Sequence, residues 1–314
     1  GRITGRVRHA GTSHIRKVMT EMVSNSAGWR DFLELCKPRV VLLMLLCAIV
    51  GMFVATPGLV SMVTAGLALL GIGLVAGSAA VVNHIADAHI DAQMARTQNR
   101  PVATGKIAPQ QAAGFAAVMG IVGMVTLWFG TNPLTAWLNL ASWVGYGLVY
   151  TLYLKRATSQ NIVIGGLFGA APPLFGWTAV TNSIEPGGLI LVLIIFMWTP
   201  PHFWALAIER KEEYSQAGIP MLPVTHGDAY TRIQIMIYTI VLVGVSLLPY
   251  FVGMSAWLYL TAATLLGLGF IYSSAVLLRQ RNPNAPMLTF RYSIWYLGLL
   301  FAALLIDHSI IHGF

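Results

Sequence analysis

The sequence predicts an all-α, multi-pass membrane protein from its composition, its long apolar runs and the placement of its charges. Of its 314 residues, 56% are hydrophobic and only 10% are charged. Soluble domains carry about 25% charged residues, so an ordinary soluble globule is excluded. A chain this apolar also cannot remain disordered in water. Because a membrane-spanning helix needs about 20 apolar residues, the chain has room for several spans.

Nine apolar runs are long enough to cross a bilayer, and Pro-, Gly- and Asn-rich breaks separate them. The expected spans are 40–56, 60–82, 111–129, 134–153, 162–180, 188–208, 234–253, 256–277 and 292–311. We therefore expect a nine-helix membrane domain over residues 31–314, preceded by a basic tail over residues 1–30.

The basic residues support this topology. All 19 Lys and Arg fall in the N-terminal segment or in the loops after spans 2, 4, 6 and 8, which nine crossings place on one face. The positive-inside rule makes that face cytoplasmic, with the N-terminus inside and the C-terminus outside. The net charge of +8 thus indicates a lipid bilayer and no nucleic acid as partner. We expect the bacterial inner membrane. The Arg-rich start leaves the mitochondrial inner membrane as an alternative.

A weak internal repeat, at an offset of 122 residues, places paired acids at the ends of spans 2 and 6. Asp87 matches Glu209, and Asp91 matches Glu213. Because four spans separate the copies, both pairs are expected on the same face, in two parallel four-helix repeats.

The first copy carries the strongest chemical signal. Asn83, Asp87 and Asp91 recur at intervals of four, so they project from one face of a helix. Two carboxylates one turn apart repel each other, and acids at a membrane border are functional by default. Oxygen ligands suit Mg²⁺, which completes its shell with substrate phosphate oxygens. The alternative is that these acids are solvated and paired with neighbouring basic residues.

Basic and aromatic residues beside the acids extend the site. Arg96, Arg100 and Lys106 follow the first copy, and guanidinium groups fork onto phosphate. Together with the acids they predict a diphosphate site at the cytoplasmic border. A polyprenyl diphosphate fits such a site, since its chain would lie among apolar helices. Phe203 and Trp204 are near the same border and could help to shield an allylic cation.

Two segments carry a resemblance to a known family. Residues 83–101, with Asn83, Asp87 and Asp91 followed by Arg96-Thr97 and Arg100-Pro101, resemble the first signature of the UbiA superfamily of intramembrane prenyltransferases. Residues 198–224, with Pro200-Pro201-His202-Phe203-Trp204 and Glu213-Tyr214, resemble the branch of that superfamily that farnesylates heme. The resemblance covers roughly residues 30–310.

The resemblance implies a nine-helix bundle with a cavity open toward the inner leaflet. It implies transfer of farnesyl from farnesyl diphosphate to a vinyl group of heme b, with addition of water, giving heme O. Mg²⁺ is the implied cofactor and heme b a substrate, with handover of the product to heme A synthase or a heme-copper oxidase. Glu213 departs from the family, which commonly has Asp at this position.

The expected site residues fall into three groups. The catalytic candidates are Asn83, Asp87, Asp91, Arg96, Arg100 and Glu213. The metal candidates are Asp87, Asp91 and Glu213, with Glu209 weaker. The substrate-binding candidates are His202, Lys37, Arg39, Lys155, Arg156, Phe203 and Trp204. For His202 we expect contact with heme, as iron ligand or propionate partner, or else a hydrogen-bonded structural role.

Two other functions remain open from the sequence. One keeps the chemistry but prenylates an aromatic quinone precursor, which would not need the Pro-His-Phe-Trp segment. The other is a secondary transporter, which can also combine parallel repeats with acids inside the membrane. The acids here stand at a helix end beside Arg and Lys, which favours the enzyme.

Overall fold

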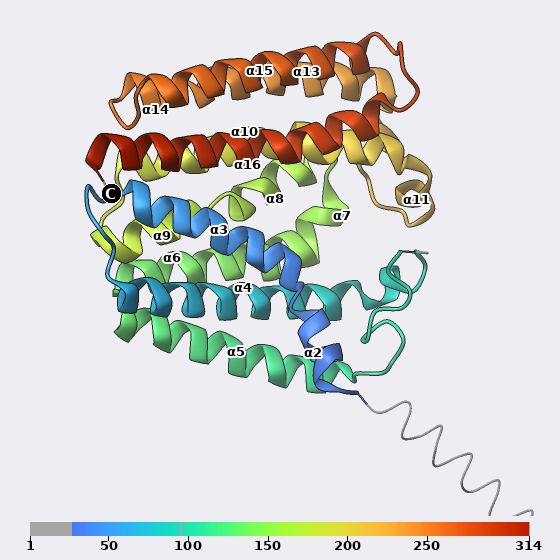
Figure 1. Ribbon diagram of the computed structural model, residues 1–314. Coiled ribbons are helices and arrows are strands. Elements are labelled where there is room, and N and C mark those ends of the chain that lie inside the picture. The colour runs from blue at the N-terminus through green and yellow to red at the C-terminus, as the bar shows by residue number, and fades with distance from the viewer. Residues whose placement is uncertain (1–26, 95, 314) are drawn as a thin grey trace, which may run out of the picture.

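The computed structural model describes residues 27–94 and 96–313, and within those ranges all regular structure is helical (Figure 1). The helices are α2 (Trp29–Leu35), α3 (Pro38–Val54), α4 (Met62–Asp91), α5 (Pro109–Gly130), α6 (Pro133–Trp143), the π-helix η1 (Val144–Leu154), α7 (Lys155–Ala157), α8 (Asn161–Gly169), α9 (Pro172–Thr181), α10 (Pro186–Glu209), α11 (Lys211–Gln216), α12 (Leu222–Thr225), α13 (Gly227–Ser246), α14 (Leu248–Phe251), α15 (Trp257–Leu278) and α16 (Ala285–His312). Most of the expected tail, residues 1–26, lies outside the described residues. Helix α2 begins at Trp29, two residues before the expected domain boundary.

Seven described segments are long and apolar enough to cross a membrane, and an eighth qualifies if α2 and α3, bent by 55° at their junction, form one span. They are Met62–Asp91, Pro109–Gly130, Asn161–Thr181, Pro186–Glu209, Gly227–Phe251, Trp257–Leu278 and Ala285–His312. The expected fourth span is divided between α6 and η1, each only 11 residues long. The multi-pass helical class is therefore confirmed, while nine spans and their orientation stay predictions.

Local chemistry explains where several helices begin. Pro38, Pro109, Pro133, Pro172 and Pro186 stand at the first turn of their helices, where the missing N–H has no intrahelical partner to lose.

Two helix ends matter for the site, and the first of them differs from the sequence prediction. Helix α4 does not end near residue 82 but continues to Asp91, so the acidic motif belongs to its last turns. Helix α10 ends at Glu209, and α11 starts after a break at Arg210. Glu209 and Glu213 therefore do not share one continuous helix.

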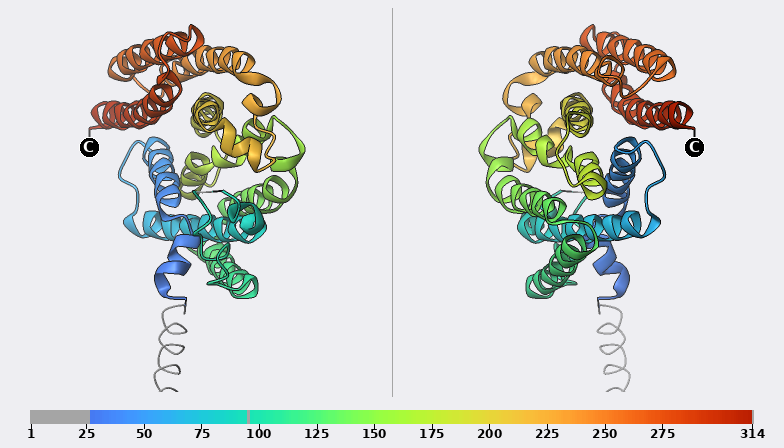
Figure 2. Two further views of the ribbon diagram at one scale, coloured as in Figure 1. Left: turned by 90° about the vertical axis from the view of Figure 1, so that its right-hand side faces the viewer. Right: turned by 90° about the vertical axis from the view of Figure 1, so that its left-hand side faces the viewer.

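The bundle has two distinct ends (Figure 1). The α4–α5 connection, α7, α11 and α2 lie at one end, while α14 and the C-terminus lie at the other. Both copies of the acidic repeat thus face the same end. Seen along the helices, the chain curves from α5 through α4, η1 and α8 to α13, α15 and α16, with α10 in the interior (Figure 2).

Candidate functional site

Asn83, Asp87 and Asp91 form a buried row of polar side chains, the polar row, along the last turns of α4. Asn83 is 4% exposed, Asp87 1% and Asp91 4%. Removing carboxylates from water is costly unless each has a counter-charge and hydrogen-bond donors. The neighbouring segments supply both.

Asp87 is held by a cation and an amide. Lys155 Nζ, at the start of α7, donates to Asp87 Oδ2 at 2.7 Å. Asn83 Nδ2 donates to the same oxygen at 2.9 Å and lies 3.4 Å from Thr151 Oγ1 of η1. Lys37, between α2 and α3, donates from Nζ to Asn83 Oδ1. Three segments that are distant in sequence, the α2–α3 junction, the end of α4 and the η1–α7 junction, therefore meet around Asp87.

Asp91 has its own partner. Arg100 Nη1, in the α4–α5 connection, donates to both carboxylate oxygens at 2.8 Å. Thr97 Oγ1 donates to the Asp91 carbonyl at 3.0 Å, which folds the connection back onto the end of α4. Arg96, in the same connection, is exposed.

Among the described residues, three buried carboxylate oxygens have no hydrogen-bond donor: Asp87 Oδ1, Glu213 Oε2 and Asp228 Oδ1. The Asp228 oxygen lies 3.0 Å from Lys211 Nζ in an ion pair, which leaves those of Asp87 and Glu213 as the candidates for a metal ion. Arg156 Nη2 lies 4.0 Å from the Asp87 oxygen, beyond hydrogen-bonding distance. Glu209, in contrast, is exposed. Unsatisfied buried oxygens are the ligands that a hard divalent cation prefers, so the donor set fits Mg²⁺.

The described residues do not form a complete metal-binding site. Within residues 27–94 and 96–313, no three His, Cys, Asp or Glu side chains are grouped closely enough to hold a metal ion. Asp87, Asp91 and Glu213 are therefore not gathered as a ligand triad in this arrangement, because Asp87 and Asp91 are drawn to Lys155 and Arg100.

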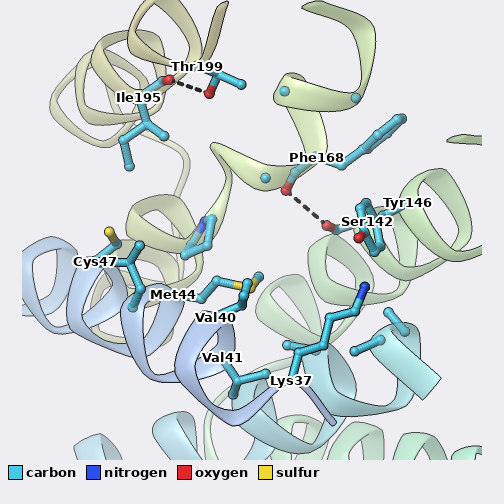
Figure 3. Close-up of a pocket in the computed structure, with 18 of the residues that line it drawn as sticks. Lys37, Val40, Val41, Met44, Cys47, Ser142, Tyr146, Phe168, Ile195 and Thr199 are labelled. Carbon is cyan, nitrogen blue, oxygen red and sulfur yellow. Dashed lines mark hydrogen bonds between the residues drawn. The ribbon is translucent and has the colours of Figure 1, made fainter. Parts of the chain in front are cut away.

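An apolar cavity of about 350 Å³ extends from Lys37 into the bundle (Figure 3). This volume lies within the range of ordinary small-molecule sites. Its walls come from α3, α4, α6, η1, α8, α9, α10 and α16, and its lining includes Lys37, Met44, Cys47, Ile72, Val75, Asn139, Ser142, Tyr146, Tyr150, Phe175, Ile195, Trp198, Thr199 and Phe203.

The π-helix η1 shapes one wall of this cavity. Tyr146 and Tyr150 stack with ring centroids 5.5 Å apart and planes 16° from parallel, and both rings line the cavity. Thr151 Oγ1 donates to the Tyr146 carbonyl at 2.7 Å, which satisfies an acceptor in the wider turn. Such π-helical segments occur frequently at functional sites.

The substrate-binding candidates divide according to whether they reach this cavity. Lys37 and Phe203 line it, whereas Arg39, His202 and Trp204 are not part of its lining among the described residues. Lys155 and Arg156 lie beside Asp87 instead.

His202 and Trp204 pack α10 against other helices. His202 stacks between Trp198, at 4.1 Å, and Phe290, at 4.6 Å, and its Nδ1 lies 2.6 Å from Ser293 Oγ of α16. Trp204 is 1% exposed and meets Tyr238 edge to face at 5.3 Å. The contacts of His202 match the hydrogen-bonded structural alternative and give no support to iron ligation.

Three residues that contact the site were not candidates in the sequence analysis. Thr151, Asn139 and Trp198 touch the polar row or the cavity. Thr151 had a usable signal, because it is the only hydroxyl outside the tyrosines in the apolar run 144–154, and polar groups in such runs are commonly functional. Trp198 offered only its place at the start of the segment 198–224 that carries the family resemblance.

The ion pair between Lys155 and Asp87 leads to a prediction about the free energy of unfolding. Lys155→Met should destabilise the protein by about 3 kcal/mol, because it leaves a buried carboxylate without its counter-charge. Adding Asp87→Asn should recover most of that loss. Denaturant unfolding of the purified protein in detergent measures both effects.

Lys211→Met is the matched control. Its ion pair with Asp228, at 3.0 Å, joins side chains that are 41% and 35% exposed, so the loss should stay below about 1 kcal/mol. Equal losses for the two single variants, or no recovery in the double variant, would contradict the role given to the Asp87 pair.

The chain resembles known proteins over most of its length. The model of the UbiA prenyltransferase family matches residues 44–305. A protein of Saccharophagus degradans named protoheme IX farnesyltransferase is 58% identical over 297 residues, covering 93% of this chain and 98% of that protein. A protein of Legionella pneumophila with the same name is 59% identical over 280 residues, covering 89% and 95%.

Solved structures share the fold at lower identity. One, described as digeranylgeranylglyceryl phosphate synthase, has a TM-score of 0.77 at 21% identity and covers 89% of this chain and 98% of its own. A UbiA homolog from Archaeoglobus fulgidus, described as bound to DMAPP and Mg²⁺, has a TM-score of 0.65 at 17% identity and covers 87% and 99%. The chain therefore belongs to the UbiA prenyltransferase family, in the group whose members are named protoheme IX farnesyltransferase.

Proposed function

We propose that this protein transfers the farnesyl group of farnesyl diphosphate to a vinyl group of heme b, with addition of water, giving heme O and diphosphate. The observation that carries the proposal is a pair of buried carboxylates, each held by a cation, at the end of α4. An apolar cavity begins beside them at Lys37. A diphosphate fits the charged end and a hydrocarbon chain fits the apolar interior. The names of the relatives supply the acceptor, heme.

The reaction balances without a redox partner. The bond between farnesyl C1 and the diphosphate oxygen breaks, and the terminal vinyl carbon of heme bonds to C1. The cation left on the inner vinyl carbon takes up water, which then releases a proton. The protein must therefore stabilise the departing diphosphate and protect two successive carbocations.

Mg²⁺, when bound, would neutralise charge on the departing diphosphate. Asp87 and Glu213 would hold it through their unsatisfied oxygens, together with Asp91. The solved homologs described with Mg²⁺ and a prenyl diphosphate support this requirement.

The basic residues would bind the diphosphate itself. Lys155 and Arg100 now neutralise Asp87 and Asp91, and either can turn from its carboxylate to a phosphate oxygen. The guanidinium of Arg100 can bind two such oxygens at once. Arg96 and Arg156, exposed at the same end, extend the positive surface that attracts the anion.

The cavity walls would protect the cationic chain. Tyr146 and Tyr150 present stacked rings to the interior, and ring faces attract positive charge. The surrounding apolar side chains exclude bulk water until the new carbon–carbon bond has formed. We place this reaction in the bacterial inner membrane, with the charged end toward the cytoplasm.

The activity prediction uses purified protein with heme b, farnesyl diphosphate and Mg²⁺, with the extracted heme analysed by mass spectrometry. The wild-type chain should give farnesylated, hydrated heme. Asp87→Asn and Asp91→Asn should each lower the rate by about 100-fold or more, the scale of losing one group that stabilises the transition state.

Asp228→Asn is the control, since it removes an acid at the same end of the bundle whose side chain is 35% exposed and is paired with Lys211. It should keep nearly the wild-type rate. Wild-type rates for the Asp87 and Asp91 variants would remove the carboxylates from the reaction. Prenylation of an aromatic quinone precursor, with heme left unchanged, would replace the proposed acceptor.

Glu213 and Glu209 provide a matched pair for the second acidic motif. Glu213→Gln should lower turnover and raise the Mg²⁺ concentration needed by about tenfold, because it removes the charge of a buried oxygen without a donor. Glu209→Gln makes the same change at an exposed side chain and should have little effect. The rate of each variant is measured as a function of Mg²⁺ concentration. If both variants show equal and mild effects, the second acidic motif does not bind the metal ion and its role is structural alone.

A further inference from the structure

We propose that the far end of the cavity, formed by Ile72, Asn139 and Phe175, sets the length of the prenyl chain that the enzyme accepts. The inference rests on the proposed function, because it takes the diphosphate to lie at the Lys37 end. The chain then points away from Lys37, and its last isoprene unit meets these three side chains, which we call the floor.

The lining residues define the direction of the cavity. Along α3 they run from Lys37 to Cys47, which is about 15 Å at the helical rise of 1.5 Å per residue. Lys37 and Cys47 stand at opposite ends of this row in Figure 3. Along α4 the lining runs from Ala80 back to Ile72, away from Asp87. Along η1 and α6 it runs from Tyr150 to Asn139, away from Lys155.

Backbone contact between α3 and α9 closes the bundle just beyond Cys47. A Cβ atom added to Gly51 would lie 1.9 Å from the Pro173 carbonyl oxygen, and one added to Gly176 would lie 1.9 Å from the Ala48 carbonyl oxygen. The two helices thus approach as closely as glycine permits. No hydrocarbon chain can pass between them without separating their backbones.

A hydrogen-bonded cluster closes the gap between α6 and α9. Asn139 Nδ2 donates to the Thr135 carbonyl at 2.9 Å, and the hydroxyls of Thr135 and Thr178 lie 2.8 Å apart. Asn132 Nδ2 donates to the Thr178 carbonyl at 2.8 Å. Thr135 and Thr178 are fully buried, so opening this cluster would leave polar groups unsatisfied in an apolar interior.

The remaining floor residues are embedded in the core. Ile72 is fully buried and Phe175 is 3% exposed. Both belong to one apolar cluster with Met52 and Leu127. Protein interiors are close-packed and yield little to extra volume. A chain that continued past the floor would therefore have to displace core side chains, which disfavours a donor longer than the cavity.

The test is a competition between two donors. The full-length enzyme receives heme b with equal concentrations of farnesyl and geranylgeranyl diphosphate, and mass spectrometry gives the ratio of C20 to C15 product. Phe175→Ala and, as a milder change, Ile72→Ala remove side-chain volume from the floor and so lengthen the cavity. Each should raise that ratio at least about tenfold over the wild type, since even one methylene changes selection in an apolar pocket by about 10–200-fold.

Phe270→Ala is the matched control. It makes the same truncation at a fully buried ring of α15 that is not among the described residues lining the cavity, and should leave the ratio within about twofold of the wild type. The ratio is measured within each sample, so it does not depend on how much folded variant is recovered.

The outcomes separate the two proposals. If the wild type farnesylates heme but both floor variants keep its product ratio, the floor does not select chain length and the present inference is overturned. The same conclusion follows if Phe270→Ala raises the ratio as much as Phe175→Ala. If the wild type prenylates no heme with either donor, the proposed function fails as well.

Discussion

Burial of two carboxylates at the end of α4 is the constraint on which the site depends. Asp87 and Asp91 are almost fully removed from solvent, and unpaired charges at such positions would cost several kcal/mol. Lys155 and Arg100 supply the counter-charges from two segments that follow α4 in sequence, the start of α7 and the α4–α5 connection. Lys37 completes the network through Asn83. The requirement for pairing therefore draws η1, the α4–α5 connection and the start of α3 to one point.

This arrangement couples the binding of a metal ion to the binding of a diphosphate. The cations that now neutralise Asp87 and Asp91 are also those that a diphosphate would need. A metal ion and a diphosphate arriving together can therefore exchange partners with Lys155 and Arg100, leaving no carboxylate or cation unpaired. Either ligand alone would leave some of these charges uncompensated. Binding of one should thus favour binding of the other, and linkage makes that effect reciprocal. Beyond Lys37 the cavity has few polar atoms, and it ends at the floor formed by Ile72, Asn139 and Phe175.

The sequence was most informative where a physical pattern was local. Spacing of four placed Asn83, Asp87 and Asp91 on one helical face, and apolar runs located the long helices. The structure extends α4 to Asp91, which hydropathy missed because the last turns are polar. It divides residues 133–154 between α6 and η1, and a π-helix has no compositional signature.

Contacts between distant segments were beyond the sequence. Lys155 was a candidate for binding substrate, yet its partner Asp87 is 68 positions away, and no local pattern joins the two. His202 and Trp204 were also candidates for binding substrate, and the structure places both outside the cavity lining. Helix α10 is apolar all round, so its sequence does not indicate which face lines a cavity and which packs on α13 and α16. Only the fold distinguishes Phe203, which lines the cavity, from its two neighbours.

The most direct measurement is the affinity of the purified protein for Mn²⁺, read by electron paramagnetic resonance with and without inorganic pyrophosphate. The wild type should bind Mn²⁺ at least about tenfold more tightly when pyrophosphate is present, within the range of ordinary coupling between sites. Asp87→Asn combined with Asp91→Asn should abolish this enhancement. Unchanged Mn²⁺ affinity and unchanged enhancement in that double variant would contradict the assignment of the buried carboxylates to a metal–diphosphate site.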